Sequence, residues 1–190
     1  MCWMAIYRGS DAVREALWAC RENEEHSGGH SWGFAVATDD GELHTGHGLG
    51  RLPPAAPDVE DDEVVAALGH TRFATRGEIT LANAHPFRVE GPKGEAVAAL
   101  AHNGTWYEAP DGDRCDSYYI ARLLEDLLIP ERDFREAVRL AGEVTGETIT
   151  VLHRDGTGYV YSGRFGITEG DACVKSTGGT PIPDGSVTKI

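Results

Sequence analysis

Apolar and polar positions in the first half of the chain follow the pattern of strands joined by tight turns. Residues 2–8 begin with an apolar run, which predicts a buried strand. The extended runs 31–38 and 42–47 flank Asp39-Asp40-Gly41, whose residue types are typical of a hairpin turn. Residues 64–68 are apolar without interruption and predict a further buried strand.

Two more hairpins are predicted later in the chain. In each, two extended runs surround a short segment of residues that favour turns. The pairs are 88–90 with 95–101 around Gly91-Pro92-Lys93-Gly94, and 147–153 with 157–162 around Arg154-Asp155-Gly156.

Three other segments repeat their apolar residues with the period of an α-helix. Ser10 is a suitable N-cap for a helix that runs to about His26. A second helix begins at Asp116 and presents a stripe of leucine, isoleucine and tyrosine. Pro130 opens a third helix, from residue 131 to about residue 143. We expect the second and third helices to cover one face of a sheet.

Residues 48–62 are rich in proline, glycine and acidic side chains. This composition predicts a surface loop, which includes Arg51-Leu52-Pro53-Pro54. Long irregular loops in compact domains are often functional, so a lid over a binding pocket is the alternative interpretation.

The length of 190 residues suits one domain. We expect residues 2–175 to form that domain, and the composition of residues 176–190 is typical of a flexible C-terminal tail. No stretch reaches the roughly 18 apolar residues of a membrane helix, and the start of the chain lacks the features of a signal peptide. These features favour a soluble, cytoplasmic protein.

Acidic residues number 31 and basic residues 17, for a formal net charge of −14. This balance argues against binding to nucleic acid or to anionic membranes, because both are bound through lysine and arginine. Only Lys93, Lys175 and Lys189 are lysines. An acid-rich, lysine-poor composition is typical of halophilic proteins, whose self-repulsion is screened by salt.

The cysteines and histidines do not predict a metal site. The four cysteines are widely spaced and contain no Cys-x-x-Cys pair: Cys2, Cys20, Cys115 and Cys173. Neither a zinc ribbon nor a disulfide framework is therefore expected. Two histidine pairs lack a third ligand at a useful spacing: His26 with His30, and His44 with His47. We expect no metal and no cofactor.

Four short blocks contain residues that could act in catalysis. If Met1 is removed, Cys2 combines a thiol nucleophile with a free α-amine that can act as its base. Alone, a cysteine before a buried strand would be interpreted as a small core residue. The other blocks change that interpretation, and they are Gly69 to Gly77, Asn83 to Phe87, and His102-Asn103-Gly104 followed by Asp116.

In this order the blocks resemble the glutaminase domain of the class II glutamine amidotransferases, which are N-terminal nucleophile hydrolases. The resemblance covers residues 2 to about 162. It implies an α+β fold, an αββα sandwich of two mainly antiparallel sheets between layers of helices. It also implies an enzyme, a glutamine amidotransferase or amidohydrolase with an N-terminal cysteine nucleophile.

The resemblance carries roles to individual residues. Cys2 would be the catalytic nucleophile, and the Asn103 side chain with the Gly104 N–H would form the oxyanion hole. Arg72 would bind the α-carboxylate of glutamine through two parallel hydrogen bonds, and Asp116 would hold its α-ammonium. Two further positions match binding-pocket or structural support, namely Thr75 and His85.

The chain departs from the family pattern at three places. Trp3 follows the nucleophile where the family usually has glycine, and Arg76 replaces a histidine. The usual Ser-Asp-Thr-Glu is Cys115-Asp116-Ser117-Tyr118. These differences leave the substrate open between glutamine and another γ-glutamyl amide.

Three functions are compatible with these observations. In the first, a stand-alone glutaminase forms a thioester on Cys2 and releases ammonia for a separate synthase subunit, since 190 residues leave no room for a synthase domain. In the second, a γ-glutamyl amidohydrolase acts on a larger metabolite. In the third, the same fold is a catalytically inert structural or binding module.

Overall fold

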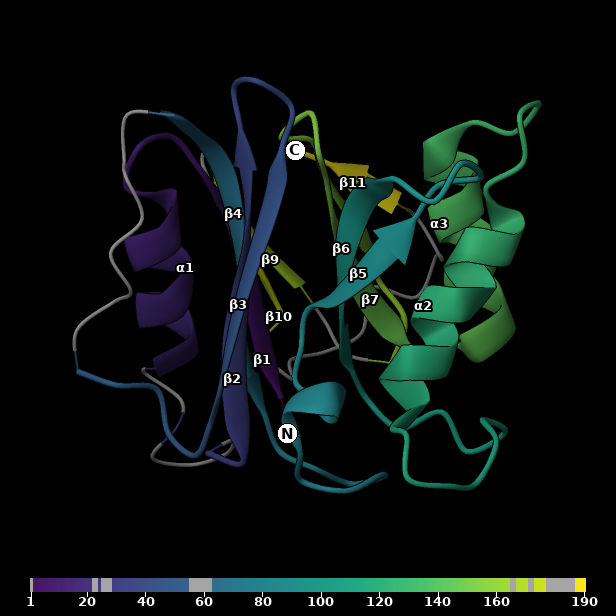
Figure 1. Ribbon diagram of the computed structural model, residues 1–190, viewed down its shortest axis with the longest axis horizontal. Helices are drawn as coiled ribbons and strands as arrows, with labels where there is room; N and C mark the ends of the chain where they lie inside the picture. The colour runs from purple at the N-terminus through teal and green to yellow at the C-terminus, as the bar shows by residue number, and fades with distance from the viewer. Residues whose placement is uncertain are drawn as a thin grey trace.

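The computed structural model describes residues 2–21, 24, 29–54, 63–164, 167–170, 173–176 and 187–190. Within these ranges two antiparallel sheets face each other, and helices cover the outer face of each sheet (Figure 1). The predicted α+β class and its αββα arrangement are therefore confirmed.

The first sheet contains six described strands. They are β1 (Trp3–Arg8), β2 (Ser31–Thr38), β3 (Leu43–Leu49), β4 (Val64–Arg72), β9 (Ile167–Gly170) and β10 (Cys173–Ser176). Their order across the sheet is β3-β2-β4-β1-β10-β9, which places β1 and β4 at the centre. The hairpin predicted around residues 39–41 joins β2 and β3 and is confirmed.

The second sheet contains five described strands. They are β5 (Phe87–Glu90), β6 (Ala96–Asn103), β7 (Thr148–His153), β8 (Gly158–Tyr161) and β11 (Val187–Lys189). Their order is β11-β8-β7-β6-β5. Both hairpins predicted in this part of the chain are confirmed, since β5 pairs with β6 and β7 pairs with β8.

The helices form the two outer layers (Figure 1). Helix α1 (Ala12–Arg21) packs on the first sheet. Helices α2 (Asp116–Leu127) and α3 (Phe134–Thr145) pack together on the second sheet, as predicted. No helix in the described part of the chain is both long and apolar enough to cross a membrane.

The predicted start of the third helix was wrong. Residues after Pro130 form a turn, in which the Arg132 N–H donates to the Ile129 carbonyl oxygen at 3.0 Å. The Arg132 guanidinium also donates to the Leu127 carbonyl oxygen at 2.8 Å, at the end of α2. Helix α3 starts only after Asp133, which is its N-cap residue. Pro130 did not locate the start of α3, because proline is common in turns as well as in the first turn of a helix.

Strand alternation decides which residues of β1 face the other sheet. Met4 and Ile6 pack in the core between the sheets, whereas Ala5 packs against α1. Because successive side chains point to opposite faces, Cys2 lies on the inner face with Met4, and Trp3 lies on the α1 face. The predicted strand thus points the Cys2 side chain into the space between the two sheets.

Gly69 allows α1 to lie close to the centre of the first sheet. A Cβ at this position of β4 would lie 2.8 Å from the backbone carbonyl group of Ala16. Glycine is needed here because any larger residue would push the helix away. The glycine that opens the second block therefore serves packing, and the residues that follow it reach the site.

The structure adds detail at two irregular regions. Leu52 was predicted to belong to a surface loop, but it is 6% exposed and packs in the core beneath α1. Val187–Lys189, which fall in the predicted tail, pair with β8. Residues 22–23, 25–28, 55–62 and 177–186 lie outside the described residues, with the predicted end of the first helix and most of the predicted loop and tail. The domain boundary at residue 175 stays a prediction.

Candidate active site

Cys2 lies directly before β1, where it is 8% exposed. The backbone N–H of Phe73 donates a hydrogen bond to its Sγ at 3.4 Å. The thiol in turn lies 3.6 Å from the Phe73 carbonyl oxygen. Since Phe73 directly follows β4, the central strand pair of the first sheet holds the thiol in place.

Burial raises the pKa of the Cys2 thiol to about 11. The Phe73 N–H and the positive charge of Arg72 act in the opposite direction but do not outweigh desolvation. The thiol is therefore protonated at neutral pH, and a nucleophilic role requires a base at the sulfur.

Asn103 and Gly104 approach Cys2 from the opposite sheet. On β6, Ala99 and Ala101 pack in the core between the sheets, so alternation puts Asn103 on the same inner face. Cys2, Asn103 and Gly104 line one cavity of about 150 Å³. Phe73, Thr75, Thr105 and Arg164 complete its wall. We call this space the outer cavity.

Gly104 has a backbone conformation and a neighbour that exclude other residues. Its φ is +146°, a value that L side chains rarely adopt. A Cβ here would also overlap the carboxylate of Glu147. The backbone of residue 104 can therefore lie against both Glu147 and the outer cavity only because it is glycine.

A second space, of only about 10 Å³, continues from Cys2 into the protein. Like the outer cavity, it is bordered by Cys2, Phe73, Thr75 and Gly104. Its other lining residues are Arg72, Arg76, His85, His102, Asp116 and Ser117. We call it the inner cavity. The structure thus brings together six of the seven predicted site residues there, and the seventh, Asn103, lines the outer cavity.

Arg72 is 2% exposed at the end of β4. Its guanidinium donates to the carbonyl oxygen of Glu78 at 3.1 Å and to that of Arg76 at 2.6 Å. These bonds fix the plane of the guanidinium within the chain segment that follows. A fixed planar donor in a cavity is suited to a carboxylate, because it can offer two parallel N–H groups.

Asp116 is the first residue of α2 and is 5% exposed. Its carboxylate accepts hydrogen bonds from the backbone N–H groups of Trp106 at 2.9 Å and Ser117 at 3.0 Å. The helix N-terminus also favours a negative charge at this position. The inner cavity therefore offers a guanidinium and a carboxylate, which match the two charges of an amino acid.

Arg76, the residue that departs from the family pattern, holds the segment after Gly104. Its guanidinium donates to the carbonyl oxygens of Trp106 at 3.0 Å, Tyr107 at 2.8 Å and Ala109 at 3.1 Å. It also forms an ion pair with Asp111. This large side chain thus stabilises one wall of the site. Thr75 has a smaller role of the same kind, with its hydroxyl 2.9 Å from that of Thr105.

Three buried histidines lie side by side behind Cys2. The ring of His85 packs on His70 with 4.1 Å between centroids, and Nε2 of His70 lies 3.3 Å from the His102 carbonyl oxygen. Burial lowers the pKa of His70 to about 3 and that of His102 to about 4, and it holds the pKa of His85 well below its ordinary value. All three rings are neutral at pH 7. No set of three His, Cys, Asp or Glu side chains in the described ranges could hold a metal ion.

Glu147 and Arg164 belong to the site although the sequence interpretation missed them. Glu147 is 2% exposed beside Gly104, and its Oε1 lies 3.6 Å from Nη1 of Arg164, which lines the outer cavity. The one local signal was Glu147 itself, a charged residue directly before an apolar strand. Trp3, in contrast, is absent from the described residues that line either cavity.

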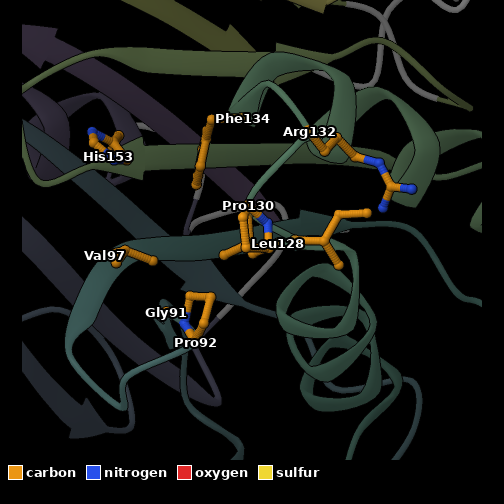
Figure 2. Close-up of a pocket in the computed structure, with 9 residues that line it drawn as sticks. Gly91, Pro92, Val97, Leu128, Pro130, Arg132, Phe134 and His153 are labelled. Atoms are coloured by element: carbon orange, nitrogen blue, oxygen red, sulfur yellow. The ribbon is translucent and has the colours of Figure 1, made fainter.

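Another cavity, of about 210 Å³, is lined by none of these residues, and Figure 2 shows the residues that line it. Its wall combines the β5–β6 turn, the segment between α2 and α3, and the end of β7. It is mainly apolar, with Pro92, Val97, Leu128 and Phe134 among its lining residues. None of the predicted site residues contributes to it, so size alone does not identify the active site.

The chain has relatives among known proteins. It is 29% identical over 153 residues to the glutamine–fructose-6-phosphate aminotransferase of Halalkalibacterium halodurans, covering 80% of this chain and 22% of the relative. For the same enzyme of Streptomyces coelicolor the identity is 29% over 196 residues, covering 90% of this chain and 31% of the relative. A comparison with protein-family models finds no match.

Solved structures share the fold. The glutamine phosphoribosylpyrophosphate amidotransferase of Bacillus subtilis, solved with ADP and GMP, superposes with a TM-score of 0.70 at 17% identity. It covers all of this chain, which spans 49% of the B. subtilis chain. The chain thus spans less than a third of the curated relatives above and about half of this structure. By sequence and fold, the chain is a homologue of the class II glutamine amidotransferases and has the N-terminal nucleophile hydrolase fold of their glutaminase domain.

Proposed function

We propose that this protein hydrolyses the side-chain amide of glutamine through a thioester on Cys2 and releases ammonia for an acceptor bound by a separate synthase subunit. Glutamate is the second product. The reaction takes place in the cytoplasm, uses no cofactor and requires that Met1 be removed. The acidic surface, with a net charge of −14, suits a salt-rich environment.

One observation carries this proposal. Cys2 and Gly104 border both cavities, with Asn103 on the outer side and Arg72 and Asp116 on the inner side. An amino acid whose charged end enters the inner cavity, which must widen from its volume of about 10 Å³ to admit it, would therefore present its side-chain amide to the sulfur. Glutamine has this shape, with the two charges at one end and an amide at the other.

The first chemical step joins the Cys2 sulfur to the amide carbon. The α-amine of Cys2, with a usual pKa of about 7.7 to 8.0, takes the thiol proton through a water molecule. The sulfur electron pair then forms the new bond, and the carbonyl electron pair moves to oxygen. The side-chain amide of Asn103 and the N–H of Gly104 donate hydrogen bonds to this oxyanion.

The intermediate then collapses. The protonated α-amine gives its proton to the amide nitrogen, the C–N bond breaks, and ammonia leaves a γ-glutamyl thioester on Cys2. Water attacks the thioester, and the α-amine accepts a proton from it. The C–S bond breaks to release glutamate and restore the thiol.

A γ-glutamyl amidohydrolase is the second candidate, and the outer cavity favours it. Phe73, Arg164 and Thr105 line this space beside the nucleophile, with Phe73 42% exposed. A leaving group larger than ammonia would find apolar and hydrogen-bonding partners there. The first step and the residues involved would be the same, and only the released amine would differ.

Substrate comparison tests the proposal. Purified protein in high salt is incubated with glutamine and with a panel of γ-glutamyl amides, and glutamate release is measured for each. We expect glutamine to be hydrolysed and Cys2→Ala to remove the activity. A kcat/KM at least tenfold higher for a larger amide would favour the amidohydrolase. Failure to cleave any of them after Met1 removal would favour the inert module.

A further inference from the structure

Glu147 stands directly before β7, at the end of the second sheet where β6 delivers Asn103. Its side chain is buried, and its carboxylate occupies the space next to the Gly104 Cα. The backbone N–H of Thr105 also lies close to this carboxylate and acts to lower its pKa. Glu147 therefore contacts both residues that follow Asn103.

One oxygen of this carboxylate has no hydrogen-bond partner among the described residues. Oε2 of Glu147 is buried without a hydrogen bond, and Oε1 lies 3.6 Å from Nη1 of Arg164. Arg164 is half exposed, lines the outer cavity and lies with its Cζ 5.9 Å from the centre of the Tyr107 ring. A buried carboxylate is costly unless it is paired and hydrogen-bonded, so an oxygen without a partner calls for an explanation.

We propose that Glu147 is a positioning residue of the oxyanion hole, which holds the Gly104–Thr105 segment so that the Gly104 N–H faces the substrate, while Arg164 balances its charge. This inference rests on the hydrolytic function proposed above. The nearby Thr105 N–H restrains one end of the segment, and contact with the carboxylate restrains Gly104. Glycine alone would leave this backbone free to adopt other conformations.

The charge of Glu147 matters because the transition state also carries negative charge close by. Two negative charges in a partly buried site repel each other strongly. Arg164 offsets this repulsion, whereas Asp116 and Glu108 are further acidic groups that act on Glu147. Burial raises the pKa of Glu147 to about 7, so its charge changes in the neutral range.

Three variants separate position from charge. Glu147→Ala removes the acceptor and should lower kcat at least tenfold with little change in KM, because substrate binding uses the inner cavity. Glu147→Gln keeps the shape and an acceptor oxygen, and should restore most of the lost rate. Arg164→Gln leaves the carboxylate unbalanced, and its rate should fall relative to the wild type as the pH rises from 6 to 8. The double variant with Glu147→Gln should lose that additional fall.

Glu24 offers a matched control. It is also a buried glutamate, and its Oε1 accepts the backbone N–H of Leu52 at 2.9 Å. It lines neither of the two cavities at Cys2. Glu24→Ala likewise removes a buried carboxylate and should leave kcat within about twofold of the wild type. An equal loss of kcat in both alanine variants would overturn the inference, since general destabilisation would then explain the effect.

Hydrogen exchange tests the positioning role without relying on activity. The Thr105 amide should exchange at least tenfold faster in Glu147→Ala than in the wild type, while amides in the middle of β6 keep their rates. Unchanged exchange at Thr105 would overturn the inference even for a protein that hydrolyses nothing. A wild-type protein that fails to cleave glutamine, with Thr105 still protected by Glu147, would instead count against the proposed function alone. If Glu147→Ala does not fold, the same comparison is made with Glu147→Gln, in which weaker acceptance should raise exchange by a smaller factor.

Discussion

The backbone N–H of Phe73 donates a hydrogen bond to the Sγ of Cys2 at 3.4 Å. This contact joins the proposed nucleophile to the residue that directly follows Arg72. The guanidinium of Arg72 is itself fixed by the carbonyl oxygens of Arg76 and Glu78. The group that would bind the substrate carboxylate and the atom that would attack its amide are therefore held by one continuous segment.

Replacing Arg72 with lysine should weaken glutamine binding and also lower stability. Lysine keeps the charge but cannot offer two parallel N–H groups to a carboxylate, nor bond both carbonyl oxygens that the guanidinium holds. We expect KM to rise at least tenfold and the midpoint of urea unfolding to fall, since an unpaired buried carbonyl costs about 1–3 kcal/mol. Steady-state kinetics and urea titration measure the two effects.

Arg88 is the matched control for that substitution, since it is exposed on β5 and lies in neither cavity at Cys2. Arg88→Lys should preserve KM. If Arg72→Lys also binds glutamine normally, Arg72 does not hold the substrate carboxylate.

Gly104→Ala should impair both activity and stability. The substitution places a side chain at φ +146° and into the carboxylate of Glu147. Strained backbone of this kind costs about 1–3 kcal/mol, and the loss of one oxyanion donor typically costs about 10²-fold to 10³-fold in rate. Thermal unfolding and glutaminase rates provide the two readouts.

Gly94→Ala is the control that distinguishes the effect of backbone strain from an effect on the site. Gly94 has φ +80° in the β5–β6 turn, and a Cβ there would meet nothing within 4 Å. Gly94→Ala should cost about 1–2 kcal/mol of stability and no activity. Equal activity loss in the two variants would show that Gly104 has no special function.

The buried histidines predict that stability falls in mild acid. The pKa of His70 is lowered to about 3 and that of His102 to about 4, and the pKa of His85 is also far below its value of 6.5 in an unfolded chain. Below pH 6.5 the unfolded chain therefore binds protons that the folded protein excludes. Each histidine contributes a loss of about 1.4 kcal/mol per pH unit until its folded pKa is reached.

Glu147 acts in the opposite direction, because its pKa is raised to about 7 from an ordinary 4.5. Between pH 7 and 4.5 the folded protein binds the additional proton, so acid relieves the cost of this buried charge. Three histidines outweigh one glutamate, and the free energy of unfolding should drop from pH 6.5 to pH 5. Urea titrations at both pH values test this, and Glu147→Gln should make the drop steeper. Greater stability at pH 5 would contradict the assignment of neutral, buried histidines.

Much of the framework could be predicted because its signals are local. Turn residues marked the hairpins at 39–41, 91–94 and 154–156, and the apolar run from Cys2 marked β1 as a buried strand. The start of α3 could not be located, because Pro130 fits a turn as well as a helix start.

The site depended on long-range contacts that no local pattern reveals. The meeting of Cys2 with Asn103 joins strands from two different sheets, and it was expected only through the family resemblance. Glu147 and Arg164 lie outside the four sequence blocks. Glu147 reaches the site through the pairing of β6 with β7, and Arg164, which follows β8, lies beside Glu147. Arg76 differs from the family pattern. Its stabilising role could not be predicted, because its hydrogen-bond partners lie 30 to 35 residues further along the chain.

The central claim is that Cys2 becomes an N-terminal nucleophile, and intact mass measured before and after treatment with a diazo-ketone analogue of glutamine tests it most directly. The protein is kept in high salt, and Cys20→Ala and Cys2→Ala are treated in parallel, since Cys20 is also a buried cysteine. We predict a mass that lacks Met1 and gains one adduct on Cys2 in the wild type and Cys20→Ala, with no adduct in Cys2→Ala. Retained Met1 with no adduct would contradict the account.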